Sequence, residues 1–555
     1  MKKKSKYEFI KDKRRVKVFY RNVYSHLIID FLFIAIQILI IGLFVFRLEK
    51  SIEVYLGISL GLSAGFMIFI VNQKGRNEFK LAWIVPMIFL PLLSIAAYIM
   101  YHTNLGSRNY GKKLSVLRKK CQEMEAPKEE ASLQEEASLQ DVASLQEEAS
   151  LQEVPSSKRM PSPQFLPASD KSFSDLQLYL TNNFFLPYEN CQTKYYLNGE
   201  SFFPELIKEI QNAQKYIFLD FFIVELDASW NEILDALEER AKAGVEIRLI
   251  CDGLGSPVVS TRLYQKYLKS KGIKSRVFIP IVPIFSTHLN HRDHRKIIII
   301  DGNTAFTGGL NLANEYFNRG KNKFAYWKDN AVKIQGPAIH TLLQLFLQSW
   351  NMFSKTPEDF SPYFPVCNQT FTEAGTIIPY GDDFFNNKDI AENIYLYIIN
   401  NAKKYLNITT PYILVDNLLQ EALFFAAARG VDVSIILPSR PDHFLTFCIG
   451  KTFLNTFVKN GIKVYLYKKG FIHQKTFIAD DKIATIGSVN LDYRSLYHHF
   501  ENGVIFIDSP IVNAVKNDFD NILKDCTLME QKDYKKIPLH IRAIGRVLRI
   551  FAPLF

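Results

Sequence analysis

Two stretches of the chain, far apart in the sequence, repeat one arrangement of residues that can do acid-base and anion chemistry. Each has a histidine, a lysine two positions later, an aspartate five positions after the lysine and an asparagine ten positions after the aspartate. The two sets are His294, Lys296, Asp301 and Asn311, and His473, Lys475, Asp480 and Asn490, separated throughout by 179 residues (473 minus 294). Because each residue type makes up a few per cent of an average protein, so many matched positions are very improbable by chance.

The histidines and lysines fit the chemistry of a phosphodiester. Residues two apart on a β-strand point the same way, so His294 and Lys296 share a face, as do His473 and Lys475. If the two copies pack about a pseudo-twofold axis, one pocket holds all four side chains. One neutral imidazole can then attack phosphorus to form a phosphohistidine, while the other protonates the leaving alcohol and later activates the acceptor. The pattern does not tell which histidine is the nucleophile.

Phosphate binding is expected from the two asparagines together with the lysines. The amides of Asn311 and Asn490 can hold the non-bridging oxygens, on which charge builds during transfer. We expect Ser488 to add a hydroxyl contact to phosphate, which Gly309 at the matching place cannot make. The two copies are therefore not interchangeable.

Two acidic residues are expected to orient the histidines. A nucleophilic histidine must be held in one tautomer by an acid on its far nitrogen. Aligning the strands that follow the two motifs matches Asp329 with Glu501 and nominates this pair. Asp301 and Asp480 complete the repeated catalytic motif, but they lie an odd number of steps from their histidines. We expect them to face away and to hold a strand or turn.

Neither a metal nor another cofactor is expected. His291 with His294 and His498 with His499 invite a metal-site interpretation. However, Lys296 lies nearby and no carboxylate cluster accompanies the histidines, so a divalent cation would be repelled. The six cysteines are scattered singly, without the spacing of a zinc site or a disulfide framework.

The elements that must position these residues follow an α/β pattern. From about residue 196 onward, short β-branched runs alternate with amphipathic helical runs. The pattern repeats: the segment 213–216 matches 402–405, and 271–274 matches 460–463. We predict two halves related by a pseudo-twofold axis, each a mixed sheet flanked by helices, over residues 173–365 and 366–527.

The first hundred residues predict an integral membrane protein. Apolar stretches at 26–46, 54–71 and 81–101 each approach the ~20 residues that cross hydrocarbon. Residues 1–105 are therefore assigned to a membrane region with two or three spans, of which the first is the weakest because it contains Asp30. Ten basic residues among residues 1–21 predict a cytoplasmic N-terminus.

A basic segment and a low-complexity linker follow, over residues 106–172. The basic residues of 108–120 also favour the cytoplasm, and both basic segments lie there only if one apolar stretch fails to cross. Residues 129–152 hold four copies of a hexapeptide, EEASLQ with the variant DVASLQ, before a Pro-rich and Ser-rich stretch. A period of six does not form a coiled-coil seam, so we expect a tether. A partner-binding repeat is the alternative.

The C-terminal segment, 528–555, has the pattern of a basic amphipathic helix. Arg542, Arg546 and Arg549 fall on one helical face and apolar residues on another. The pattern suits an anionic membrane surface or an ordinary packing helix, and leaves both open. The net charge of +11 (67 basic minus 56 acidic residues) also suits a polyanionic partner, and the predicted spans favour a membrane over nucleic acid.

The repeated motif, HxKxxxxD followed by GGxN or GSxN, resembles that of the phospholipase D superfamily. The flanking sequence resembles the bacterial cardiolipin synthases over residues 81 to about 555. The resemblance rests on Leu197–Glu200, Asp252–Ser256, Asn290–Lys296, Asn314–Tyr316, Thr410–Tyr412, Gly470–His473 and Asn490–Ser495. Departures include the extra N-terminal stretch, the hexapeptide linker, Asp293 where the family commonly has Asn, and Val415 where it commonly has Pro. None of these touches a catalytic position.

The resemblance implies a phosphatidyltransferase of the bacterial cell membrane. One phosphatidylglycerol would give its phosphatidyl group to the enzyme with loss of glycerol, and a second would accept it to give cardiolipin. It implies a multi-pass protein, with the catalytic halves favoured on the cytoplasmic side. Rival functions are phospholipase D hydrolysis, transfer to another alcohol, and, less favoured because both motifs are complete, a non-enzymatic lipid-binding scaffold. The oligomeric state is left open.

Overall fold

The computed structural model describes most of the chain beyond residue 51. The described residues are 52–102, 108–125, 173–280, 291–320, 323–354, 356–364, 371–385 and 388–554. The predicted apolar stretch at 26–46 and the hexapeptide linker lie outside them.

The first half is a seven-stranded mixed sheet in the order β1-β8-β6-β5-β2-β3-β4. Its strands are β1 (Gln192–Tyr196), β2 (Tyr216–Phe221), β3 (Glu246–Asp252), β4 (Ile273–Phe278), β5 (Lys296–Ile300), β6 (Thr304–Gly308) and β8 (Ala331–Gln335). β2, β3 and β4 are parallel to one another, and the other pairs are antiparallel. Its helices are α8 (Gly199–Asn212), α9 (Ala228–Lys242), α10 (Arg262–Ser270) and α11 (Ile339–Met352).

The second half repeats this topology in an eight-stranded sheet, in the order β17-β12-β11-β10-β14-β15-β16-β9. Its strands are β9 (Thr376–Asp382), β10 (Tyr405–Thr409), β11 (Asp432–Pro438), β12 (Lys463–Tyr467), β14 (Thr476–Ala479), β15 (Ile483–Gly487), β16 (Glu501–Ile507) and β17 (Cys526–Leu528). Its helices are α12 (Ile390–Asn401), α13 (Asn417–Ala428), α14 (Phe444–Lys459), α15 (Tyr493–Tyr497) and α16 (Pro510–Leu523). The predicted pair of mixed sheets flanked by helices is confirmed.

Local sequence explains these elements. β2 and β5 are almost wholly apolar and fully buried, as expected for strands covered on both faces. Helices begin where a polar side chain accepts a hydrogen bond from the first turn: Asn198 caps α8, Asp227 caps α9 and Asp416 caps α13. The strand that begins two residues after His294, β5, is therefore buried and covered on both faces.

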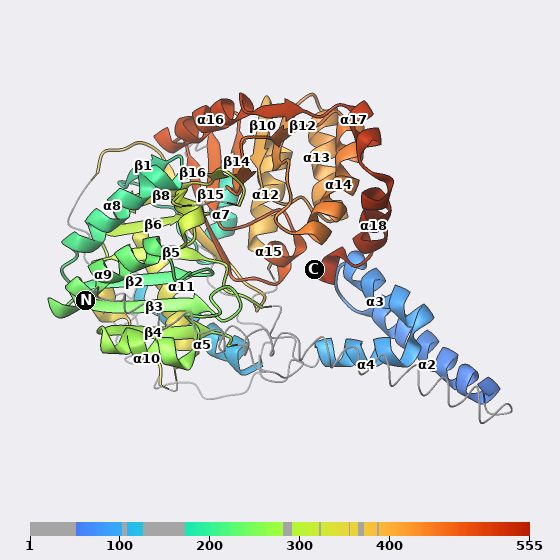
Figure 1. Ribbon diagram of the computed structural model, residues 1–555, viewed down its shortest axis with the longest axis horizontal. Helices are drawn as coiled ribbons and strands as arrows, with labels where there is room; N and C mark the ends of the chain where they lie inside the picture. The colour runs from blue at the N-terminus through green and yellow to red at the C-terminus, as the bar shows by residue number, and fades with distance from the viewer. Residues whose placement is uncertain are drawn as a thin grey trace, which may run out of the picture.

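The two halves share one core (Figure 1). Leu342 and Phe346 of α11 belong to the same buried cluster as Val504 and Phe506 of β16. A short parallel ladder between β7 (Trp327–Lys328) and β13 (Phe471–Ile472) also joins the halves. The site between the halves is therefore built on a common hydrophobic base.

Two helices that precede the sheets in sequence lie against this body. α5 (Arg108–Glu125) packs against α11 of the first half, where Leu114 and Leu117 are buried. α7 (Ser174–Thr181), which the sequence assigned to the first half, contributes Leu176 and Leu180 to the core of the second half.

An arm of three helices extends from the second half (Figure 1): α2 (Ile52–Asn72), α3 (Asn77–Phe89) and α4 (Pro91–His102). Among the residues described, no helix has the length and apolar character needed to cross a bilayer. The predicted spans at 54–71 and 81–101 are therefore not supported. The latter is divided at Leu90, because a residue before proline disfavours helical geometry. Helices of 13 and 12 residues result, each about 20 Å long.

A buried ionic cluster fixes the arm to the second half. Arg76, in the turn between α2 and α3, makes ion pairs with Asp389, Glu392 and Asp416 around the starts of α12 and α13. Its guanidinium also lies 4.4 Å from the centre of the Tyr497 ring. Because these partners are partly or fully buried, the contact holds the arm in a defined place.

The C-terminal segment forms α17 (Gln531–Lys536) and α18 (Leu539–Arg549). α18 packs on α14 at Gly545, where an added Cβ would lie 2.2 Å from the carbonyl oxygen of Cys448. The guanidinium of Arg549 covers the Phe453 ring at 4.1 Å. The helix packs on the second half, while Leu539 and Val547 stay exposed, so contact with a membrane surface stays a prediction.

Candidate active site

The two histidine-bearing segments are each held by the opposite half of the molecule. The backbone N–H of His294 donates to the carbonyl of Phe500 at 2.8 Å, and that of His473 donates to Lys328 at 2.7 Å. These bonds are related by the pseudo-twofold axis, because Phe500 and Lys328 each immediately precede a predicted orienting acid. The two motifs therefore meet at the boundary between the halves.

Each histidine is paired with the acid of the other half. His294 Nδ1 lies 2.9 and 3.0 Å from the two carboxylate oxygens of Glu501. His473 Nδ1 lies 2.7 Å from Asp329 Oδ2. The acids that the alignment nominated do contact the histidines, but crosswise. A carboxylate on Nδ1 favours the Nδ1–H tautomer and leaves Nε2 free to react.

The two lysines are buried in the same site. Each ammonium contacts the carbonyl oxygen of the histidine two positions earlier, and Lys475 Nζ lies 2.8 Å from His473 Nδ1. Burial lowers the pKa of Lys296 to about 7 and that of Lys475 to about 8. The charge of Lys475 contributes to the shift of Lys296, which lies in the other half. One site therefore contains both motifs, and an anion bound there would restore the lysine charges.

Burial keeps both histidines neutral. Burial lowers the pKa of His294 to about 3 and that of His473 to about 4. Burial alone would raise the pKa of Glu501 and Asp329, but the neighbouring histidine and lysine groups outweigh it and hold both below their usual range. The site thus pairs neutral imidazoles with ionised carboxylates, the arrangement that a nucleophile and an acid-base partner need.

Asp301 and Asp480 do not touch the reacting groups. Asp301 accepts hydrogen bonds from the backbone N–H groups of residues 214, 215 and 216 at 2.6–2.9 Å. Asp480 accepts from residues 403, 404 and 405 at 2.7–3.0 Å. Both hold the turn that starts β2 or β10, the structural role that the odd spacing indicated.

The predicted phosphate ligands differ in what they contact. Asn311 Oδ1 accepts a hydrogen bond from the N–H of Ile223 at 3.1 Å, which fixes its side chain. Asn490 Oδ1 is buried without a hydrogen-bond partner among the described residues. The Ser488 hydroxyl donates to Glu501 and also lies 3.1 Å from the carbonyl of Asn502, so it supports the orienting acid. The sequence did not indicate this contact.

Gly309 occupies the matching place in the other half for a steric reason. A Cβ added there would lie 2.0 Å from Asp329 Oδ1. The shorter aspartate therefore needs glycine behind it, whereas Glu501 has room for the Ser488 hydroxyl.

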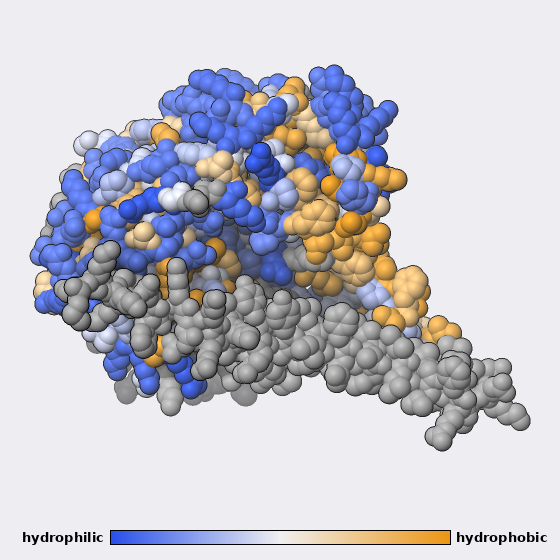
Figure 2. Space-filling model, viewed as in Figure 1, coloured by the Kyte–Doolittle hydropathy of each residue, from blue (hydrophilic) through white to orange (hydrophobic). Residues whose placement is uncertain are grey.

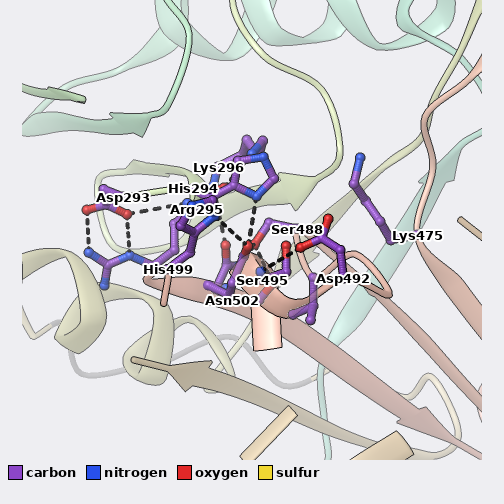
Figure 3. Close-up of polar contacts among 12 residues, drawn as sticks. Asp293, His294, Arg295, Lys296, Lys475, Ser488, Asp492, Ser495, His499 and Asn502 are labelled. Atoms are coloured by element: carbon purple, nitrogen blue, oxygen red, sulfur yellow. Dashed lines mark hydrogen bonds and ion pairs between the residues drawn. The ribbon is translucent and has the colours of Figure 1, made fainter. Parts of the chain in front are cut away.

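Sequence reasoning missed two residues beside His294. The His499 ring lies 5.6 Å from the His294 ring, and its Nδ1 is 3.6 Å from Glu501 Oε1 (Figure 3). The Phe222 ring packs against His294 at 5.2 Å. The alignment that nominated Glu501 also matches His499 with Trp327, a signal that could have identified it.

His294, His499 and Glu501 are the one group of the described residues whose ligand atoms are close enough to share a metal ion, all within 4.8 Å. The ammonium of Lys296 disfavours positive charge in this group. Burial is the main cause of the lowered pKa of His294, Glu501 opposes the shift, and the charge of Lys296 adds to it. A cation there would also occupy the histidine needed for phosphorus chemistry. The donor set therefore fits a phosphodiester better than a metal.

Comparison with known proteins agrees with this geometry. The family model described as "Cardiolipin synthase, PLD-like domain" matches residues 206–350 and 395–523, once in each half. A cardiolipin synthase of Clostridium perfringens is 30% identical over 491 residues, which are 87% of this chain and 95% of that protein. An uncharacterized protein of Streptococcus mutans is 41% identical over 66% of this chain and 79% of its own length.

A solved structure shares the fold. The crystal structure of phosphatidylserine synthase from Haemophilus influenzae Rd KW20 superposes with a TM-score of 0.54 at 15% identity, over 67% of this chain and 97% of that one. With two complete motifs meeting at the boundary of two such halves, and relatives matched over most of their length, the chain belongs to the cardiolipin synthase family of phospholipase D-like proteins.

Proposed function

We propose that the protein is a phosphatidyltransferase that makes cardiolipin and glycerol from two molecules of phosphatidylglycerol. The observation that carries this proposal is the crosswise pairing of two neutral imidazoles with two carboxylates, beside two buried lysines, in one site. The cardiolipin synthases among the relatives support the same substrate class.

The chemistry proceeds in two displacements at phosphorus. In the first, Nε2 of one neutral histidine attacks phosphorus, and the bond to the glycerol oxygen breaks. The other histidine takes up a proton from solvent when the bound anionic phosphate favours its charged form, and it gives that proton to the leaving oxygen. In the second displacement, the histidine that gave up its proton removes a proton from a hydroxyl of the second phosphatidylglycerol. The alkoxide oxygen then attacks phosphorus, the bond from phosphorus to the nucleophilic histidine breaks, and cardiolipin leaves.

The lysines and asparagines stabilise the charge on the non-bridging oxygens. Lys296 and Lys475 are desolvated, so an anionic phosphate regains for each the charge that burial disfavours. Preorganised donors in a site that excludes water are usually the largest single term in such catalysis. Transfer exceeds hydrolysis only if water does not reach the phosphohistidine, so phospholipase D activity is the alternative function.

We also infer that the arm attaches the enzyme to the bacterial cell membrane. Figure 2 shows apolar residues along the arm and over the adjoining α13, α14 and α18 of the second half. Exposed residues on the arm include Ile58, Leu60, Ile68, Phe69, Ile88 and Phe89. A contiguous apolar surface of this kind suits a lipid interface. The basic segments at residues 1–21 and 108–120 favour the cytoplasmic side.

The test of the activity is product analysis by mass spectrometry. The purified full chain is incubated with vesicles of phosphatidylglycerol, and cardiolipin and glycerol are expected in equal amounts. Phosphatidic acid as the main product would reassign the protein to a phospholipase D. Added phosphatidylethanolamine, which has no free hydroxyl, then tests another donor, because release of free ethanolamine would show that it can replace phosphatidylglycerol in the first displacement.

The test of attachment is flotation with phosphatidylglycerol vesicles. Ile68→Glu with Phe69→Glu places two charges on the exposed face of α2, where these side chains are 65% and 51% exposed. We expect this variant to float less, while Leu263→Glu on α10, also exposed, floats like the parent. Equal flotation of all three proteins would contradict the role of the arm.

A further inference from the structure

The pseudo-twofold axis matches every position of one half-site with a position of the other. Leu312 bridges to Val224, and Leu491, 179 residues after Leu312, bridges to Ile413 in the same parallel way. The helical turns that follow begin after matching residues, so Tyr316 corresponds to Ser495. The strands that carry Asp329 and Glu501 match Trp327 with His499.

The His473 side of the site is filled by two aromatic rings. The centre of the Tyr316 ring lies 5.6 Å from that of His473, and the Trp327 ring lies 5.1 Å away. Both are buried. Aromatic rings therefore pack closely around His473.

The His294 side has polar groups at the same two places. Ser495 is 1% exposed and His499 is 9% exposed. Ser495 Oγ and His499 Nε2 have no hydrogen-bond partner among the residues that the structure describes. In the view of Figure 3, Ser495 lies between His499 and Asp492. Buried polar groups are normally satisfied, so two such atoms beside a reacting histidine point to a ligand.

The His499 ring indicates what kind of ligand this is. Neither ring nitrogen has a hydrogen-bond partner among the described residues; Nδ1 faces Glu501 Oε1 at 3.6 Å, beyond hydrogen-bond distance, so Nε2 is the nitrogen left for a ligand. A ring nitrogen of histidine can donate or accept a hydrogen bond, so its ligand must be able to do either. An ionised phosphodiester oxygen can only accept, whereas an alcohol hydroxyl can donate to Nε2 and also bond to the Ser495 hydroxyl.

We propose that Ser495 and His499 form the subsite for the glycerol headgroup of phosphatidylglycerol, where they hold the hydroxyl next to the reacting oxygen. This inference rests on the proposed function, and it adds which histidine faces the alcohol and which one binds phosphorus. The alcohol then leaves and enters on the His294 side, so His294 transfers the proton to and from the alcohol oxygen. His473, on the opposite side of phosphorus, forms the bond to it.

The subsite is tested by a competition for one phosphohistidine. The donor is a phosphatidyl ester of p-nitrophenol, and glycerol and 1-propanol are supplied as acceptors at equal concentration. The ratio of phosphatidylglycerol to phosphatidylpropanol reports acceptor choice independently of the first step, which nitrophenol release measures. 1-Propanol has the length of glycerol and lacks the neighbouring hydroxyl.

We expect His499→Phe and Ser495→Ala each to lower this ratio by about fivefold to tenfold, the effect of one neutral hydrogen bond. The matched control His540→Phe, at an exposed position on α18, keeps the parent ratio. If both variants kept the parent ratio while nitrophenol release fell, the residues would support His294 and the subsite would be wrong. If the parent protein made no phosphatidyl alcohol at all, the proposed function itself would fail.

The direction is tested by trapping the covalent intermediate. Nitrophenolate leaves without a proton, so His294→Gln should release about one nitrophenol per enzyme and retain the lipid on His473, located by mass spectrometry of peptides. His473→Gln should release none. A phosphatidyl group found on His294 in the parent protein or in His473→Gln would overturn the assignment.

Discussion

The two halves of the active site have the same backbone arrangement, but different side chains surround each histidine. Glu501 contacts His294 through both oxygens and also receives the Ser488 hydroxyl, with His499 alongside. Asp329 contacts His473 through one oxygen, and its other oxygen accepts the N–H of Asn330 at 2.9 Å. The first half-site is a polar network, whereas in the second His473 contacts one carboxylate and Lys475 among aromatic rings.

This difference teaches that a duplicated fold can keep its geometry while its two copies take different parts in one reaction. The backbone bonds that place the histidines agree within 0.1 Å, since they measure 2.8 and 2.7 Å. The side chains that control proton position and neighbouring space have diverged. Substitutions at matched positions should therefore have unequal effects.

The largest effect is expected at the histidines, where the two half-sites are equally necessary. His294→Ala and His473→Ala should each lower cardiolipin formation by about 10⁴-fold or more, because each removes one partner of a two-step transfer. Steady-state product analysis with phosphatidylglycerol measures this. Full cellular function of His294→Ala would instead support a lipid-binding scaffold.

The two lysines should set the pH above which kcat/KM declines. Their lowered pKa values, about 7 for Lys296 and about 8 for Lys475, mean that the free enzyme loses these charges as the pH rises through this range. Because an anionic lipid needs the charged form, kcat/KM should fall above about pH 7, by up to tenfold per pH unit. Lys296→Arg should move part of the decline to higher pH, because guanidinium stays charged. A decline that does not move would exclude Lys296.

The two orienting acids should differ in importance. Glu501→Gln disturbs His294, His499 and Ser488 together, so we expect a loss of kcat of about 10³-fold. Asp329→Asn disturbs one pair, and a loss of about 10- to 100-fold is expected. Parallel kinetic measurement of both variants, with folding checked by circular dichroism, decides this. Equal losses would mean that the His499 side adds nothing to the network.

Substitutions of Gly309 and Ser488, the residues behind the two acids, should also have unequal effects. Gly309→Ser places a Cβ 2.0 Å from Asp329 Oδ1, so it should displace the acid, lower the melting temperature and reduce kcat by about tenfold or more. Ser488→Gly removes one hydrogen bond to Glu501 and should reduce kcat by about fivefold. A stable, active Gly309→Ser variant would show that Asp329 can move without loss.

The smallest effect on chemistry is expected at the aspartates of the motif. Asp301→Ala leaves three backbone N–H groups of the turn before β2 without their acceptor, so it should lower the melting temperature. Turnover per folded molecule should stay within about threefold of the parent. A collapse of kcat in a fully folded variant would restore Asp301 to the catalytic group.

Much of the fold could be predicted from the sequence because the two motifs repeat the same residues at the same spacing. The matched motifs predicted two halves, and the short β-branched runs between helical patterns predicted a mixed sheet in each. An alignment pairs Asp329 with Glu501, but it cannot tell which strand end faces which histidine. The crosswise contact depends on how the halves dock, and no local pattern records that.

Two further features have local causes that the sequence analysis did not use. The predicted span at 81–101 was treated as one apolar run, although Pro91 marks the break at Leu90. Ser488 was assigned to phosphate because of its place in the motif, but the side chain of Glu501, longer than that of Asp329, reaches its hydroxyl. Hydropathy and motif position do not record such contacts.

The backbone bonds from Arg292–His294 to Phe500, and from Phe471–His473 to Tyr326 and Lys328, mean that each half completes the catalytic pair of the other. A single half, folded alone, would therefore possess a histidine without its acid. A protein with only one copy could complete this pair only as a symmetric dimer of identical chains. With both copies in one chain, matched positions need not carry the same residue, and glycine stands opposite serine and tryptophan opposite histidine at equivalent places.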